Sequence, residues 1–165
     1  MRIVRFTPGP ESGLGADPLF GVLEDDNLIT VISGDPIYHG VTKTAAKVEL
    51  SKVRLLAPVI PRSNIVAVGK NYADHAKETG AEIPKEPILF FKSTTALSGP
   101  NDNIIIPKNS SKTDWEVELA IIIGKKASYV AEADAYEYVA GYCLHNDLSE
   151  REFQLEKGGN WSKGK

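Results

Sequence analysis

Two glutamates, Glu116 and Glu118, occupy alternate positions in residues 114–124. β-Branched and aromatic residues dominate this segment and a glycine closes it, which predicts a strand. Because side chains alternate between the two faces of a strand, the carboxylates share one face, with Cβ atoms about 7 Å apart. At that spacing both carboxylates reach one small, hard cation. Buried without a cation, they would repel each other and one would protonate.

The alternative interpretation is that Glu-x-Glu marks the solvated face of an antiparallel sheet. The residues that follow argue against it, because Ala120, Ile122 and Ile123 make the far end of the segment apolar. We therefore favour a site in which the carboxylates face inward. The opposite face of the predicted strand carries an apolar row: Trp115, Val117, Leu119 and Ile121.

A second candidate pair, His75 and Glu78, lies in residues 70–80, which predict a short helix with Gly80 near its C-terminal cap. Residues three positions apart share a helix face. A carboxylate beside an imidazole orients the ring and raises its pKa, which suits a general base near neutral pH. The alternative is an ion pair on a solvated helix, and the residues alone leave both interpretations open.

The surrounding elements predict how these side chains are positioned. Residues 1–57 predict a small β-rich domain, with a hairpin turn at 24–27 and strands at 2–6, 20–23 and 28–32. In the remaining part, residues 58–165, strands are predicted at 64–69, 88–92, 104–107 and 139–147. Helices are predicted at 131–138 and 150–156, the second with Ser149 as its N-cap.

Composition excludes several classes of protein. The 165 residues are 42% hydrophobic and 25% charged, as in ordinary soluble domains. A net charge of -3 gives no reason to expect a nucleic acid or an anionic membrane as a partner. The single cysteine, Cys143, excludes a disulfide framework and favours a cytoplasmic location. We expect its thiol to be packed in the core. No apolar run reaches the roughly 20 residues of a membrane span, and the N-terminus lacks the apolar core of a signal peptide.

Five segments in order resemble motifs of the fumarylacetoacetate hydrolase family. They are Gly-x-Asn-Tyr-x-x-His at 69–75, Pro-x-x-Phe-x-Lys at 87–92, Trp-Glu-x-Glu-Leu at 115–119, Asn-Asp-x-Ser-x-Arg at 146–151 and Trp-x-x-Gly-Lys at 161–165. The resemblance covers residues 64–165, and the preceding part is similar to the small β domain of many bacterial members. It implies an α+β, mainly β fold, with a mixed β-roll or sandwich core and short helices. The family core normally continues past Lys165, so we expect a C-terminally truncated member.

The same resemblance assigns roles to individual residues. It implies metal ligands for Mg²⁺ or Mn²⁺ at Glu116, Glu118 and Asp147. It implies catalytic groups at His75 and Glu78, on a short lid helix, and at Lys165. It implies a substrate pocket lined by Lys92, Arg151 and Gln154. An all-carboxylate ligand set suits a hard cation that prefers oxygen. For Lys92, a lysine that only extends to the surface is the simpler alternative.

The function implied by the resemblance is a divalent-metal-dependent enzyme acting on a 2-oxo acid or 1,3-diketo acid. Carbon–carbon cleavage would proceed through a metal-stabilised enolate, as hydrolysis of an acylpyruvate or fumarylpyruvate or as decarboxylation of oxaloacetate. One alternative is an isomerase of the 2-hydroxyhepta-2,4-diene-1,7-dioate type in aromatic catabolism. Another is a noncatalytic binding or assembly module on the same fold. Relatives are usually homodimers, so we expect a homodimer and a small-molecule substrate.

Overall fold

The computed structural model describes residues 1–78, 80 and 82–165, and the side chains of His75 and Ala76 lie outside that description. The chain divides into two compact units. The first comprises Met1–Ile60, Leu97–Ile104 and Ile121–Cys143, and the second comprises Pro61–Ala96, Ile105–Ala120 and Leu144–Lys165. More described residues lie in strands than in helices, and the helices are short, which confirms the predicted α+β, mainly β class. None of the described helices has the length and apolar character needed to cross a bilayer.

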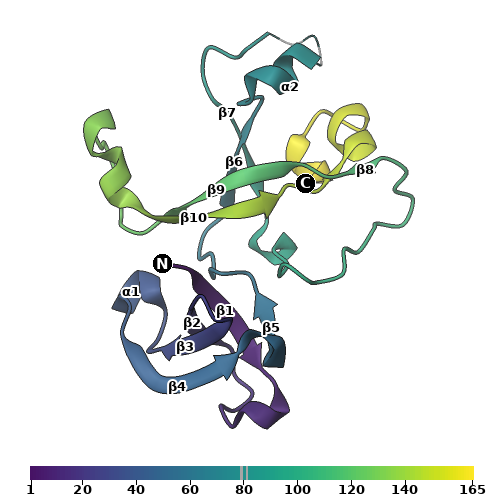
Figure 1. Ribbon diagram of the computed structural model, residues 1–165. Helices are drawn as coiled ribbons and strands as arrows, with labels where there is room; N and C mark the ends of the chain where they lie inside the picture. The colour runs from purple at the N-terminus through teal and green to yellow at the C-terminus, as the bar shows by residue number, and fades with distance from the viewer. Residues whose placement is uncertain (79, 81) are drawn as a thin grey trace. The chain divides into compact units, whose positions relative to one another are not determined.

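The N-terminal part of the first unit is a five-stranded antiparallel sheet in the order β4-β3-β2-β1-β5 (Figure 1). Its strands are β1 (Ile3–Pro8), β2 (Leu19–Leu23), β3 (Leu28–Ile32), β4 (Lys43–Glu49) and β5 (Val53–Leu56). Its short helices are η1 (Pro10–Ser12), α1 (Pro36–His39) and η2 (Leu50–Lys52). Phe6 and Ile29, both 0% exposed, pack with Val31 and Val48 to form its core. The three strands predicted in this part are confirmed.

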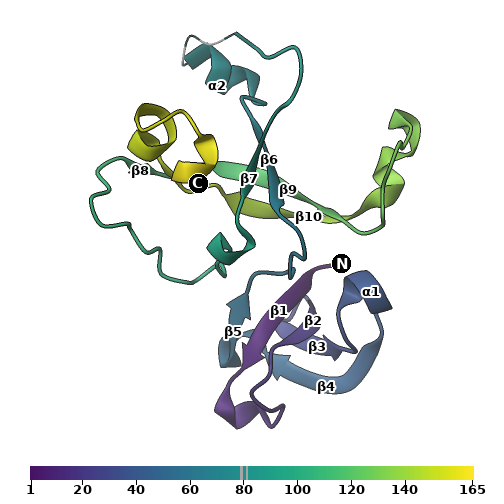
Figure 2. The same cartoon turned by 180° about the vertical axis from the view of Figure 1, so that it is seen from behind.

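The second unit contains a hairpin of β6 (Ile65–Gly69) and β7 (Ile88–Lys92), which pair antiparallel. Helix α2 (Ala73–Glu78) lies in the connection between them, as Figures 1 and 2 show from opposite sides. Along β7, Phe90 and Lys92 are buried while Leu89 and Phe91 are exposed. The alternation of the strand therefore turns Lys92 inward, on the same face as Phe90.

The carboxylate strand is shorter than predicted. Residues 113–114 form β8 (Thr113–Asp114), which pairs antiparallel with β11 (Ser149–Glu150), while β9 spans Val117–Ile123. Strands β9 and β10 (Val139–Asn146) form a two-stranded sheet, with the helical segment η4 (Glu132–Tyr138) in their connection. The backbone N–H of Asp147 donates to the carbonyl of Glu116 at 2.9 Å. This bond brings the end of β10 beside the start of β9.

Two local predictions were wrong. Residues 104–107 form no strand, because no described strand pairs with them, and Ile105 is 89% exposed. The helix predicted at 150–156 is confirmed as the π-helical segment η5 (Glu152–Glu156), but the predicted cap was wrong, because Ser149 lies in β11. Glu150, directly before the N-cap residue Arg151, accepts from the backbone N–H of Phe153 through its Oε2 at 2.8 Å. That bond satisfies a donor that the start of the helix leaves free.

The second unit also contains the short helix η3 (Thr94–Ala96) and the last described helix, η6 (Trp161–Gly164). The first residue of η6, Trp161, packs against the β6–β7 hairpin and holds η6 in place. The ring of Trp161 contacts Phe90 edge-on, with 5.6 Å between centroids. It also covers Gly69, where a Cβ atom would lie 2.3 Å from the indole. A glycine at position 69 therefore lets Trp161 approach β6, and this contact holds the segment that ends in Lys165.

We predict that Gly69→Ala lowers the free energy of unfolding by about 1–3 kcal/mol, because the added methyl group displaces Trp161 from a filled site. Urea unfolding of the full chain measures the change. Gly141→Ala is the matched control, since a Cβ atom at this β10 glycine meets no atom within 4 Å. Equal effects of the two substitutions would show that the contact between Gly69 and Trp161 does not constrain the fold.

Candidate metal centre

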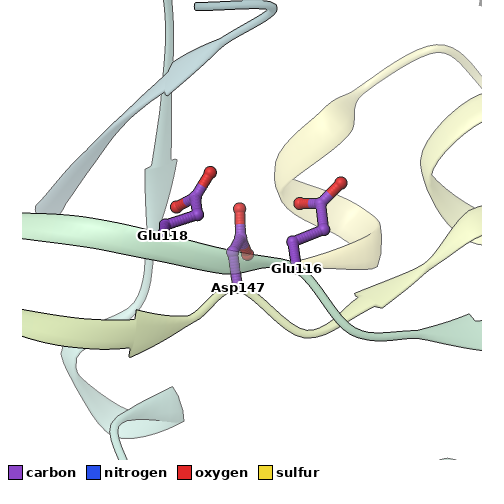
Figure 3. Close-up of side chains that lie close together, drawn as sticks. All are labelled: Glu116, Glu118 and Asp147. Carbon is purple, nitrogen blue, oxygen red and sulfur yellow. The ribbon is translucent and has the colours of Figure 1, made fainter. Parts of the chain in front are cut away.

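The three predicted ligands lie together. Glu116 precedes β9, Glu118 lies within it and Asp147 follows β10. One carboxylate oxygen from each lies within 4.8 Å of the others. Figure 3 shows the three side chains projecting to the same side of the two strands. Asp147 is buried, and both glutamates are half-buried.

The alternation of β9 explains why the glutamates share this face. Glu118, Ala120 and Ile122 are half-buried, whereas the residues between them are exposed. The carboxylate face is therefore the inner one, as the sequence indicated. The interpretation of Glu-x-Glu as a solvated sheet face does not fit this arrangement.

Asp147, only 1% exposed, lies between two buried lysines. Lys92 Nζ donates to Asp147 Oδ1 and, at 3.2 Å, to the carbonyl of Leu148. Lys165 Nζ donates to Asp147 Oδ2 and to Glu116 Oε2, both at 2.8 Å. The side chains of Lys92 and Lys165 are 7% and 3% exposed, so Lys92 does not extend to the surface. Both ammonium groups face the carboxylates that are expected to bind metal.

Arg151 contacts the carboxylate oxygen of Glu116 that Lys165 does not contact. Its Nη2 donates to Glu116 Oε1 at 2.5 Å and to Asp114 Oδ2 at 2.8 Å. Its Nη1 donates to Oε1 of the buried Gln154 at 3.1 Å. Arg151 and Gln154, which the resemblance assigned to the substrate pocket, thus lie next to Glu116.

These contacts set the protonation of the cluster. Burial by itself raises the pKa of Asp147, but hydrogen bonds from Lys165 and Lys92 outweigh it and hold that pKa below its usual value. Burial likewise raises the pKa of Glu116, and the bonds from Lys165 and Arg151 lower it further than burial raises it. Both carboxyl groups are therefore ionised at neutral pH, as metal ligands must be.

The catalytic pair stays a prediction. His75 and Glu78 both belong to α2, and Glu78 is exposed. The side chain of His75 lies outside the part of the chain that the structure describes. No distance between the two groups is therefore defined.

Three contacts near the carboxylates were not anticipated. His145 Nδ1 lies 3.4 Å from Glu118 Oε2, and Asn146 Oδ1 accepts from the backbone N–H of Glu116 at 3.2 Å. The Tyr72 hydroxyl accepts from the backbone N–H of Leu119 at 3.4 Å. The side-chain types alone gave no signal for these contacts. The place of His145 and Asn146 directly before Asp147 would have indicated them once the pairing of β9 with β10 was known.

The donor set fits a divalent cation of the Mg²⁺ or Mn²⁺ type. All three ligands are carboxylates, which hard cations prefer. In an octahedral complex with bonds of about 2.1 Å, ligand oxygens lie roughly 3 Å apart when adjacent and 4.2 Å apart when opposite. The 4.8 Å limit on the separations here is close to that range, so small side-chain rotations suffice.

Comparison with known proteins identifies the family. Residues 64–165 match the family described as fumarylacetoacetate (FAA) hydrolase, C-terminal, and residues 1–58 match the family described as Rv2993c-like, N-terminal. The first match covers more than half of the chain. The chain belongs to the fumarylacetoacetate hydrolase family.

Individual relatives agree with this assignment. A provisionally named hydrolase of Burkholderia cenocepacia is 60% identical over 100% of this chain and 61% of its own length. The crystal structure of a 5-carboxymethyl-2-hydroxymuconate delta-isomerase from Mycobacterium smegmatis has a TM-score of 0.82 at 34% identity, over 100% of this chain and 62% of that one. A 2-hydroxyhepta-2,4-diene-1,7-dioate isomerase from Mycobacterium marinum has a TM-score of 0.79 at 34% identity, over 100% and 61%. The chain thus spans about three fifths of the length of these relatives.

We predict that Asp147→Asn destabilises the chain by about 3–5 kcal/mol at pH 7 in the presence of a chelator, because it leaves two buried lysines without their shared carboxylate. The folded-state pKa of Asp147 is depressed, so its contribution is complete above the unfolded pKa of about 4. The contribution is lost as the pH falls through the folded-state value. The stability difference from the parent should therefore shrink below about pH 4, which urea unfolding between pH 7 and pH 3 measures.

The matched control for this pH series is Asp25→Asn. Asp25 pairs with Arg2 at the surface and is fully exposed, so its substitution should have only a small effect on the free energy of unfolding throughout the series. A stability difference for Asp147→Asn that stays constant down to pH 3 would contradict the proposed pairing of this carboxylate with the two lysines.

Proposed function

We propose that the chain forms the metal-binding part of a divalent-metal-dependent enzyme that acts on a 2-oxo acid or 1,3-diketo acid and cleaves a carbon–carbon bond. The observation that carries the proposal is the gathering of Glu116, Glu118 and Asp147 around one point, with Lys165 in contact with two of them. Because relatives are longer than this chain, the proposal concerns the activity of the whole protein.

The charge of the cluster supports an anionic substrate. The cluster contains four carboxylates, those of Glu116, Glu118, Asp147 and Asp114, and three cations, those of Lys92, Lys165 and Arg151. The cluster by itself carries one net negative charge. A divalent cation would change this to one net positive charge, which favours binding of a carboxylate-bearing substrate.

The residues support distinct roles in such a reaction. A divalent cation held by the three carboxylates would supply Lewis-acid polarisation of the carboxylate and keto oxygens of the substrate. Lys165 offers a positive donor where negative charge develops on the keto oxygen. Arg151 and Gln154 are suited to orient the substrate, and Arg151 forms bonds that a substrate carboxylate would also accept. His75, with Glu78, would take a proton from water in a hydrolysis.

Isomerisation is the second candidate. Two solved relatives, each 34% identical to this chain, are named as isomerases of hydroxymuconate-type and hydroxydienedioate-type substrates. The same polarised keto acid supports proton transfer between carbons when no water is activated. Which reaction occurs then depends on the proton-transfer groups rather than on the carboxylates.

The proposal also covers the cofactor, the cellular location and the oligomeric state. We expect Mg²⁺ or Mn²⁺ as the cofactor, since both take the same oxygen ligands. By resemblance to the family, we also propose a cytoplasmic homodimer, and light scattering coupled to size exclusion tests the dimer. A noncatalytic binding or assembly role is the competing proposal, and the turnover measurements below decide between them.

We predict that the chain binds Mn²⁺ in a calorimetric titration and binds it more tightly with oxalate, a planar dianion that offers two oxygens to one cation. Glu116→Gln should weaken Mn²⁺ binding by about 100-fold or more. This exceeds the loss that usually follows when a residue that only hydrogen-bonds to a metal ligand is replaced, because Glu116 is itself a proposed ligand. Glu86→Gln, at an exposed carboxylate, is the control and should leave the affinity unchanged. Affinity for Mn²⁺ that is equal in all three proteins would refute the metal site.

For the whole protein, a substrate panel separates the reaction types. Oxaloacetate and an acylpyruvate report carbon–carbon cleavage through pyruvate release, and a 2-hydroxydienedioate reports isomerisation through its ultraviolet spectrum. We predict turnover of at least one of them with Mg²⁺ or Mn²⁺, and its loss in Glu116→Gln. Turnover that survives Glu116→Gln would contradict the mechanism, and the absence of any turnover would favour a noncatalytic role.

A further inference from the structure

We infer that His145 is a positioning residue for Glu118: its imidazole holds this carboxylate in the orientation that binds the cation. The inference rests on the proposed function, because it concerns the same metal site. Neither the sequence motifs nor the names of the relatives assign a role to His145.

The residues at the end of β10 and directly after it organise the cluster in three different ways. His145 Nδ1 contacts Glu118 Oε2 at 3.4 Å, and Asn146 Oδ1 accepts from the backbone N–H of Glu116 at 3.2 Å. Asp147 supplies the third carboxylate, and its backbone N–H donates to the carbonyl of Glu116. Three consecutive residues thus contact Glu116 or Glu118, and His145 is the one directed at Glu118.

The three carboxylates differ in how they are held. Asp147 accepts hydrogen bonds from Lys92 and Lys165, and Glu116 accepts them from Lys165 and Arg151. Among the described side chains, Glu118 is hydrogen-bonded to His145 alone. A glutamate side chain has three rotatable bonds, so the orientation of Glu118 depends on this contact more than that of Glu116 or Asp147 depends on any single partner.

The geometry defines what the imidazole does. A carboxylate oxygen only accepts hydrogen bonds, so the hydrogen in this contact lies on Nδ1 of His145. Nδ1 donates to Oε2, which leaves Oε1 of Glu118 available to a cation. Both side chains are half-buried, at 22% and 23% exposure, so water competes less with this bond than it would at the surface. Hydrogen bonds to metal ligands of this kind typically change metal affinity 10- to 100-fold.

The test is a calorimetric Mn²⁺ titration of the parent chain, His145→Leu, His145→Asn and the control His39→Leu. Leucine fills space but donates no hydrogen bond, whereas the amide of asparagine places a donor near the position of Nδ1. We expect His145→Leu to bind Mn²⁺ about tenfold more weakly and His145→Asn to regain most of that loss. His39 is an exposed residue of α1, and its replacement should leave the affinity for Mn²⁺ unchanged. Thermal unfolding with a chelator checks that each variant is folded.

Each outcome decides the inference. Restored binding in His145→Asn, with unchanged thermal unfolding in both variants, supports it. Unchanged affinity in His145→Leu overturns it while leaving the metal site intact. Equal weakening in both variants, together with a lower melting temperature, shows a packing role and also overturns it. Failure of the parent chain to bind Mn²⁺ overturns the proposed function, and this inference with it.

Discussion

The burial of Asp147 is the constraint on which the site depends. A carboxylate that is 1% exposed loses most of its hydration, and it stays ionised because two ammonium groups replace the water. Those groups come from different segments, Lys92 from the end of β7 and Lys165 from the residue after η6. The pairing of charges therefore fixes three parts of the chain at one point. Glu116 and Asp147 both accept a hydrogen bond from Lys165, so the ionised state of Glu116 depends on the same ammonium group.

Features with a local cause could be predicted from the sequence. Strand alternation placed Glu116 and Glu118 on one face, and the structure shows that face turned inward. Short runs of apolar and aromatic residues located most strands, including β6, β7 and β10. Asp147 is different, because its membership in the cluster came from the resemblance to a family motif. Its distance in sequence from Glu116 gave no other reason to join them.

Features that depend on pairing between distant segments could not be predicted. Residues 104–107 have a strand-like composition, but no described strand lies beside them. Serine is a residue type that favours the N-cap of a helix, yet the pairing of Ser149 with Asp114 places it in a strand. The inward direction of Lys92 follows from the alternation of β7 only when the buried face is known. The contact between His145 and Glu118 likewise requires the pairing of β9 with β10.

The position of Lys165 has a consequence for how an ion enters and leaves. Its ammonium group bonds to two of the three carboxylates, and the packing of Trp161 on Gly69 fixes the segment that carries it. An incoming cation would therefore share these oxygens with the ammonium group of Lys165, whose side chain is 3% exposed. The affinity for a cation would then be lowered by repulsion between the cation and the ammonium group, and the same repulsion would speed dissociation. We therefore expect a bound cation to exchange with the ions in solution rather than to be retained permanently.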